Sequence, residues 1–179
     1  MKRSAALIWL LVAVMVGLVA PPASAAPYCG IRWGSLPEGV DTMSGGQLVD
    51  VRAGRHACFD RLVLDVRGDV SGYAVHYVDQ VTMDVSGELV PLRGGARLEV
   101  VSRVPAYDES GNSTYPPASR SNLVNVNGFR TFRQVSWAGT FEGLTTIGLG
   151  VRARLPFRVF LLDGPGDGSR MVVDVAHRW

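Results

Sequence analysis

The sequence predicts a mostly β-strand domain that follows an amino-terminal sorting signal. From Leu48 onward, short runs of β-branched residues alternate with glycine, proline and aspartate turns, as in all-β proteins. The clearest strand pattern covers residues 147–155, where apolar side chains alternate with glycine or arginine at a two-residue period. No long stretch after residue 25 repeats apolar residues at the helical period. These three observations place the chain in the all-β class.

Residues 1–25 have the three-part order of a secretory signal peptide. Lys2 and Arg3 form a basic start, residues 5–20 are apolar, and small residues follow. This order predicts cleavage after Ala25. The alternative is a retained membrane anchor, but the apolar run is shorter than the roughly 20 residues that a spanning helix needs. We therefore expect an exported protein, secreted or associated with the cell wall, with no transmembrane segment after cleavage.

The two cysteines, Cys29 and Cys58, are expected to form a disulfide, because exported proteins meet oxidising conditions. A closed loop of this length contributes about 3–4 kcal/mol in the chain-entropy model. Three residues separate Cys29 from the predicted cleavage site, which argues against lipid modification. The disulfide would fasten an extended, glycine- and proline-rich lead-in, residues 26–47, to a folded domain, residues 48–179.

The charge of the chain excludes one class of partner. Eighteen Lys plus Arg stand against sixteen Asp plus Glu, and removal of Lys2 and Arg3 with the signal leaves sixteen against sixteen. Nucleic-acid binders usually carry an excess of basic residues. Nucleic acid is therefore not an expected partner. The remaining 154 residues, 179 less 25, are enough for one domain with a real core.

Further strands and turns follow along the chain. Residues 97–100 alternate charged and apolar side chains, as a half-buried strand does. Pro156 is expected to end or bulge the strand at 147–155, with strand pattern continuing over 157–162. The turn signals lie at residues 86–87, 94–95 and 163–169.

A six-residue pattern occurs twice: residues 61–66 read Arg-Leu-Val-Leu-Asp-Val, and residues 170–175 read Arg-Met-Val-Val-Asp-Val. In both copies alternate apolar residues can fill a core. The pattern is either coincidence among β-rich segments or the use of equivalent strands by the two sheets of a sandwich. Both interpretations keep the fold all-β. The aspartates need partners, and arginines on neighbouring strands are the expected ones.

The sequence contains no recognisable catalytic or metal-binding motif. Its histidines, His56, His76 and His177, are not paired at metal-ligand spacing, so neither a metal nor a cofactor is expected. A hydrolase that uses two carboxylates remains an alternative, since such pairs meet only in space. Asp108 and Glu109 would be its first candidates, although a solvated turn is the simpler interpretation of both.

A binding surface is the remaining hypothesis for function. The long segment 104–122 carries two tyrosines and a Pro-Pro pair, and arginines follow it. Aromatic rings stack on sugars or apolar surfaces, and guanidinium groups match carboxylates, so a carbohydrate–peptide polymer with free carboxylates would fit. Alternatively, the tyrosines simply pack onto the sheet. The candidate ligand-binding residues are Tyr107, Tyr115, Arg120, Arg130 and Arg133.

Several strand patterns resemble one family of exported proteins. Residues 50–66 resemble the opening of the AMIN-like domain of secreted and lipid-anchored actinobacterial proteins, and Gly72-Tyr73 with Tyr77 fits its next strand. Residues 155–159 and 170–177 are similar to its final strands. The resemblance covers nearly all of the chain after residue 48. Because its motifs are mostly strand patterns, it specifies the fold better than the activity.

The resemblance implies a two-sheet β-sandwich that binds peptidoglycan or another envelope component without catalysis. Two departures limit this transfer: the chain lacks the lipid-attachment motif of many relatives, and no amidase accompanies the domain. We expect a non-catalytic binding module whose partner is a cell-wall polymer or an envelope protein. The alternatives are a small secreted wall hydrolase or transferase, and a protein-binding module that docks through a strand edge or the long loop.

Overall fold

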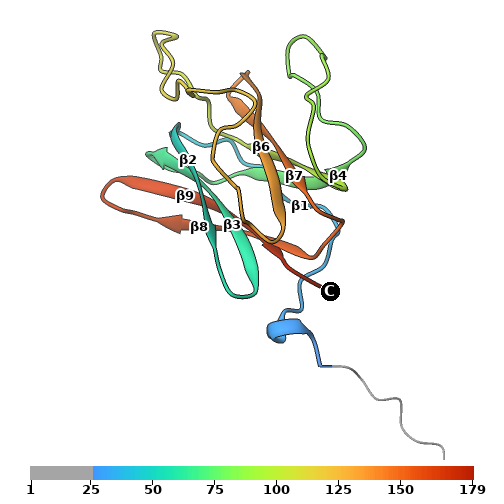
Figure 1. Cartoon of the computed structure of the whole chain (residues 1–179). Helices are drawn as coiled ribbons and strands as arrows, with labels where there is room; N and C mark the ends of the chain where they lie inside the picture. The colour runs from blue at the N-terminus through green and yellow to red at the C-terminus, as the bar shows by residue number, and fades with distance from the viewer. Residues whose placement is uncertain (1–25) are drawn as a thin grey trace, which may run out of the picture.

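The computed structural model describes residues 26–179, which form two antiparallel sheets packed face to face (Figure 1). One sheet has the strand order β1-β4-β5-β7-β6 and the other β2-β3-β9-β8. The prediction of an all-β sandwich is confirmed, whereas the predicted signal peptide lies outside the described residues. The strands are β1 (Glu38–Val40), β2 (Gln47–Arg55), β3 (Phe59–Arg67), β4 (Tyr73–Val78), β5 (Ala96–Ser102), β6 (Phe132–Phe141), β7 (Leu144–Val151), β8 (Phe157–Asp163) and β9 (Gly168–Ala176).

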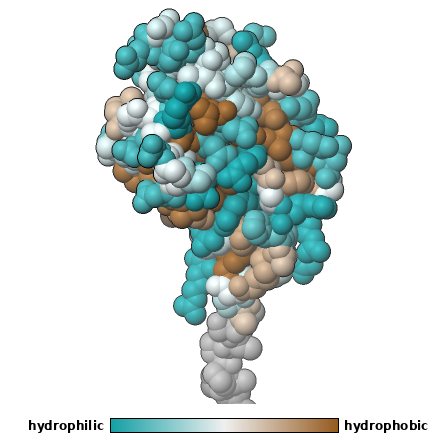
Figure 2. All heavy atoms as spheres, turned by 90° about the vertical axis from the view of Figure 1, so that its left-hand side faces the viewer, coloured by the Kyte–Doolittle hydropathy of each residue, from teal (hydrophilic) through white to brown (hydrophobic). Residues whose placement is uncertain are grey.

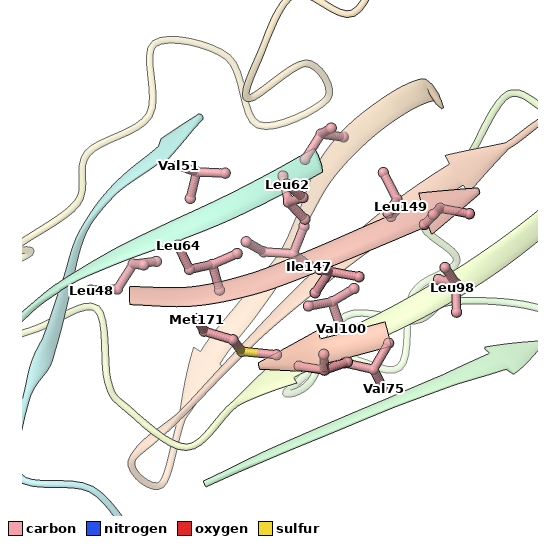
Figure 3. Packing of buried hydrophobic residues seen from close by; sticks show 14 of the residues in the cluster. Leu48, Val51, Leu62, Leu64, Val75, Leu98, Val100, Ile147, Leu149 and Met171 are labelled. Atoms are coloured by element: carbon pink, nitrogen blue, oxygen red, sulfur yellow. The ribbon is translucent and has the colours of Figure 1, made fainter. Parts of the chain in front are cut away.

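The core lies between the sheets and takes alternate side chains from both. Leu62 and Leu64 of β3, and Ile147 and Leu149 of β7, point into it and are fully buried (Figure 3). Full burial of one such side chain contributes about 1.5–3 kcal/mol. Within residues 26–179 no helix is long and apolar enough to cross a membrane.

The predicted strand at 147–155 is shorter than its pattern. Strand β7 ends at Val151, and residues 152–156 cross to the other sheet, where β8 begins at Phe157. The expected continuation beyond Pro156 is therefore a separate strand in the opposite sheet. The glycines of the pattern also have a structural role: a Cβ at Gly148 would lie 2.8 Å from Leu92. The connection 79–95 packs directly on this outer face, which explains why small residues alternate there.

The repeated pattern does not place equivalent strands in two sheets, so that prediction was wrong. Its copies lie in β3 and β9, which are antiparallel neighbours in one sheet. Their pairing centres on Val63 opposite Val172, so each arginine lies opposite the aspartate of the other copy. Antiparallel pairing of two copies of Arg-x-Val-x-Asp gives this arrangement when the central valines lie opposite each other.

Cross-strand arginines pair with the repeat's aspartates, as expected. The Asp174 carboxylate is completely buried and accepts bidentate hydrogen bonds from Arg61, at 2.6 and 2.9 Å, and two more from Arg158 on β8, at 3.0 and 2.8 Å. Asp65 accepts a bidentate pair from Arg52 on β2 at 2.5 and 2.9 Å, and the Arg52 side chain is half exposed.

The lead-in closes one side of the sandwich. The predicted disulfide between Cys29 and Cys58 is present and joins this segment to the turn before β3. Farther along, the carbonyl of Gly34 accepts the Phe157 N–H at 2.8 Å, while β1 pairs with β4 of the other sheet. The lead-in thus contacts edge strands of both sheets.

Asp60 joins the two sheets at the end where the chain terminates. It lies at the start of β3 and is fully buried. Its Oδ2 accepts the N–H groups of Thr131 and Phe132, at 2.6 and 3.1 Å, where β6 begins in the other sheet. Its Oδ1 lies 3.2 Å from Nε2 of His177, just after β9. One carboxylate therefore holds three segments together.

Replacing Asp174 tests the ion-pair network of the repeat. Asp174→Ala should lower the free energy of unfolding by about 2–4 kcal/mol, because two partly buried guanidinium groups lose their counter-charge. Asp65→Ala is the matched control, and removing this more exposed pair should cost less than about 1 kcal/mol. Urea denaturation measures both values. Equal losses of unfolding free energy in the two variants would show that the buried carboxylate stabilises the fold no more than the exposed one.

Replacing Asp60 tests the connection between the sheets. Asp60→Ala leaves two buried N–H groups without an acceptor, each of which costs about 1–3 kcal/mol. Asp60→Asn retains one acceptor oxygen and should cost clearly less than the alanine variant. Urea denaturation measures the free energy of unfolding of both variants. An alanine variant as stable as the asparagine variant would show that Asp60 does not connect the sheets through these hydrogen bonds.

Candidate functional site

The candidate site is built by the long connection between β5 and β6, residues 103–131, which passes the ends of β2 and β6 (Figure 1). This segment is ordered by hydrogen bonds although it has no regular strand. The Thr114 hydroxyl donates to the Leu48 carbonyl at 2.7 Å, and the Ala106 N–H donates to Oγ1 of Thr140 at 3.0 Å. The connection is thereby attached to one strand of each sheet.

The outermost part of this connection is a compact turn organised by Asp108. Its Oδ1 accepts the N–H groups of Ser110 and Asn112 at 2.9 and 2.8 Å. The Asn112 side-chain amide donates to Oδ2 at 3.1 Å. This side-chain hydrogen bond, followed by the backbone ones, lowers the pKa of the Asp108 carboxyl. A lowered pKa suits a turn former and opposes a role as general acid, which needs a raised one.

The connection encloses a hollow of about 450 Å³ against β6. Its walls are mainly aromatic rings and prolines, and the only charged side chain in its lining is Arg120. We call this feature the loop hollow; the lining residues that matter here are Tyr107, Tyr115, Pro116, Pro117, Arg120 and Trp137.

Its aromatic walls are held rigidly. The centres of the Tyr115 and Trp137 rings lie 5.8 Å apart, the ring planes meet at 43°, and both residues are buried. Burial, with a smaller effect of the Asp50 charge, raises the pKa of Tyr115 to about 12. The Tyr107 hydroxyl accepts the Gly143 N–H at 3.0 Å, which fixes this ring beside the β6–β7 turn.

Arg120 is fixed at its backbone and free at its side chain. Its carbonyl accepts the Trp137 N–H at 2.7 Å and the Ser136 hydroxyl at 3.2 Å, so the segment lies along the edge of β6. Among the residues that the structure describes, its exposed guanidinium group has no hydrogen-bond or ion-pair partner. An unpaired guanidinium beside aromatic walls can bind a carboxylate or phosphate.

The structure brings Tyr107, Tyr115 and Arg120 together but not the other two candidates. Arg130 and Arg133 lie at the opposite end of β6, next to the segment held by Asp60. The Arg133 guanidinium donates to the carbonyls of Phe129, Arg130 and Phe132 at 2.9–3.3 Å.

A second aromatic–arginine surface was not predicted. On the outer face of the β2-β3-β9-β8 sheet, Arg158 lies 4.4 Å from the centre of the Trp33 ring and 4.9 Å from that of Phe160. Arg61 lies 5.3 Å from the Phe59 ring. Asp174 compensates only one of the two guanidinium charges. In the sequence, only the Arg and Asp of the repeat pointed to this surface. No pattern marked Trp33 or Phe160 as part of it.

The histidines are placed as structural or surface residues. His177 contacts Asp60 inside the domain, while the exposed His56 stacks on Phe59 with ring centres 4.5 Å apart. His56 is thus not the partner of the nearby Asp60. His76 lies 3.4 Å from Glu99 on the surface. Within residues 26–179 no group of three or more His, Cys, Asp or Glu side chains is arranged to hold a metal ion.

Comparison with protein-family models matches residues 46–177 to the AMIN-like domain. The match covers almost the same residues as the resemblance in the strand motifs. No curated protein matches the chain.

The raised pKa of Tyr115 predicts a loss of stability in alkali. Tyrosine in the unfolded chain ionises near pH 10, whereas Tyr115 in the folded domain ionises near 12. Its contribution is therefore complete below pH 10 and is lost as the pH rises from 10 to 12. Tyr115→Phe should flatten the fall in the free energy of unfolding over this range. An unchanged slope would contradict the shift, and absorbance titration of tyrosinate measures it independently.

Proposed function

Because the chain belongs to the AMIN-like domain family, we propose that it is an extracytoplasmic, non-catalytic module that binds peptidoglycan or a related cell-envelope polymer. AMIN-like domains bind envelope components and are generally binding modules rather than enzymes. We propose the loop hollow as the ligand site. The observation that carries this assignment is an unpaired guanidinium at the rim of an aromatic hollow.

The chemistry of the loop hollow fits a polymer of sugar rings and short peptides. Tyr107 and the prolines offer apolar faces to sugar rings or methyl groups, and Arg120 offers a bidentate partner to a peptide carboxylate. The volume of the hollow lies within the range of small-molecule sites, so it accommodates one repeating unit rather than a long segment.

The alternatives receive less support from the geometry. A wall hydrolase would need two facing carboxylates, whereas Asp108 is engaged in its own turn. Docking through a strand edge would need free N–H and C=O groups. The lead-in already bonds to β8 through Gly34, and the segment at Arg120 bonds to β6 through Trp137.

Co-sedimentation with isolated cell-wall sacculi, over a salt titration, tests this function. The domain should bind saturably and retain binding at moderate salt. Arg120→Gln should weaken binding about ten-fold, because a charge-assisted bidentate hydrogen bond contributes about 1.5–3 kcal/mol. Tyr107→Ala should weaken it by a similar factor through loss of stacking.

Arg130→Gln is the matched control, because it removes the same charge at the far end of β6. Its binding should equal that of the unaltered domain. Thermal unfolding of each variant separates loss of binding from loss of fold. If the domain binds sacculi but Arg120→Gln and Arg130→Gln bind equally, the loop hollow is not the site. If the domain does not bind sacculi at all, the proposed function fails.

A further inference from the structure

The chain from residue 26 onward has no net charge, yet its charges are separated between the two ends of the sandwich. At one end lie the lead-in, the β2–β3 turn and the last residues of the chain; we call it the basic end. Apart from Arg158, which is paired with Asp174, its connections and adjoining strand termini contain nine arginines against Glu38, Asp60 and Asp79. These arginines are Arg32, Arg55, Arg93, Arg97, Arg130, Arg133, Arg152, Arg154 and Arg178.

The opposite end, which we call the acidic end, has the reverse composition. Its connections and strand termini, together with the part of the connection 79–95 that bonds to Ala138 on β6, contain nine acidic residues against Arg67, Arg103 and Arg120. Strands of nine residues span about 30 Å, which is several times the Debye length of roughly 8 Å at physiological salt. The two ends therefore present separate electrostatic surfaces. The acidic residues are Asp41, Asp69, Asp84, Glu88, Asp108, Glu109, Glu142, Asp163 and Asp167.

The basic end also exposes large apolar side chains. Leu36 is 75% exposed and Trp179 is 67% exposed. The Trp179 indole N–H donates to the Arg154 carbonyl at 3.0 Å, which holds the ring against the arginine-rich turn after β7. Arg178 lies 5.6 Å from the centre of the Tyr28 ring. Hydrophobic atoms lie among hydrophilic ones at this end, above the grey trace in Figure 2.

This combination fits a lipid surface better than a soluble polymer. Arginines attract anionic headgroups, while tryptophan and leucine gain free energy by entering the boundary between headgroups and acyl chains. A hydrated anionic polymer would satisfy the arginines and could stack on Trp179, but it would leave Leu36 in water.

We propose that the basic end docks on an anionic lipid surface, with Arg32 and Arg178 at the headgroups and Trp179 and Leu36 inserted at the boundary. This contact goes beyond the proposed function and does not depend on it. It would direct the loop hollow, which opens near the acidic end, away from the membrane. The domain would then hold an envelope polymer on one side and the membrane on the other.

Vesicle co-sedimentation tests the contact with residues 26–179, which contain both sheets, the whole core and the disulfide. The domain should bind vesicles that contain phosphatidylglycerol and should not bind vesicles of phosphatidylcholine alone. Arg32→Gln and Arg178→Gln should each lower partitioning about five-fold. Trp179→Ala should lower it as well and should diminish the blue shift of tryptophan emission that accompanies binding.

Arg67→Gln and Val85→Ala are the matched controls, because both residues are exposed and lie away from the basic end. Neither should change vesicle binding, and neither should Arg120→Gln, which tests the loop hollow separately. Three results would overturn the proposal: no binding to anionic vesicles, equal binding to both vesicle types, or equal losses in basic-end and control variants. Binding to sacculi that is lost in Arg178→Gln, without vesicle binding, would assign this end to a wall polymer instead.

Discussion

The fold depends on one buried carboxylate, which lies in one sheet and accepts hydrogen bonds from the backbone of the other. Asp60 accepts the first N–H groups of β6 and contacts His177 after β9, so it fixes where one sheet begins relative to the end of the other. A carboxylate is tolerated inside the domain only because these donors satisfy it. Its effect reaches the far end of the molecule. Once β6 is positioned, the Trp137 N–H donates to the Arg120 carbonyl, so that the Arg120 segment lies along the edge of β6. The loop hollow forms against the same strand.

Local patterns in the sequence predicted local structure well, and pairing between distant strands poorly. The two-residue period at residues 147–151 is enough to predict a strand there. The two cysteines are likewise enough to predict their disulfide. In contrast, alternation shows that a strand has two faces but not which strand lies beside it. For this reason one of the two interpretations of the repeat placed its copies in different sheets, whereas they pair within one. Pro156 was expected to end or bulge the strand, but β7 already ends at Val151, and nothing local indicated that the chain then changes sheets.

The same distinction applies to the candidate site. Tyr107, Tyr115 and Arg120 lie close together in the sequence and remain together in space. Arg130 and Arg133 follow only a few residues later, yet the connection runs the length of β6 and carries them to the opposite end. Trp137 was missed because an aromatic residue inside a strand has the appearance of ordinary core. The separation of charge between the two ends was also invisible, since net charge is a sum and its arrangement depends on the direction of every strand.

The pairing of the two repeat copies also dictates when the domain can fold. Arg61 and Asp174 are 113 positions apart, and β9 lies between β3 and β8 in the sheet. A ribosome must therefore complete almost the whole chain before β3 meets its inner neighbour. Until then, β2 and β3 lack the other two strands of their sheet. Contacts between segments that are distant in the sequence also form slowly. While it is being made, a chain of this kind lacks one of its two sheets, and an incompletely folded polypeptide is one that can be threaded across a membrane.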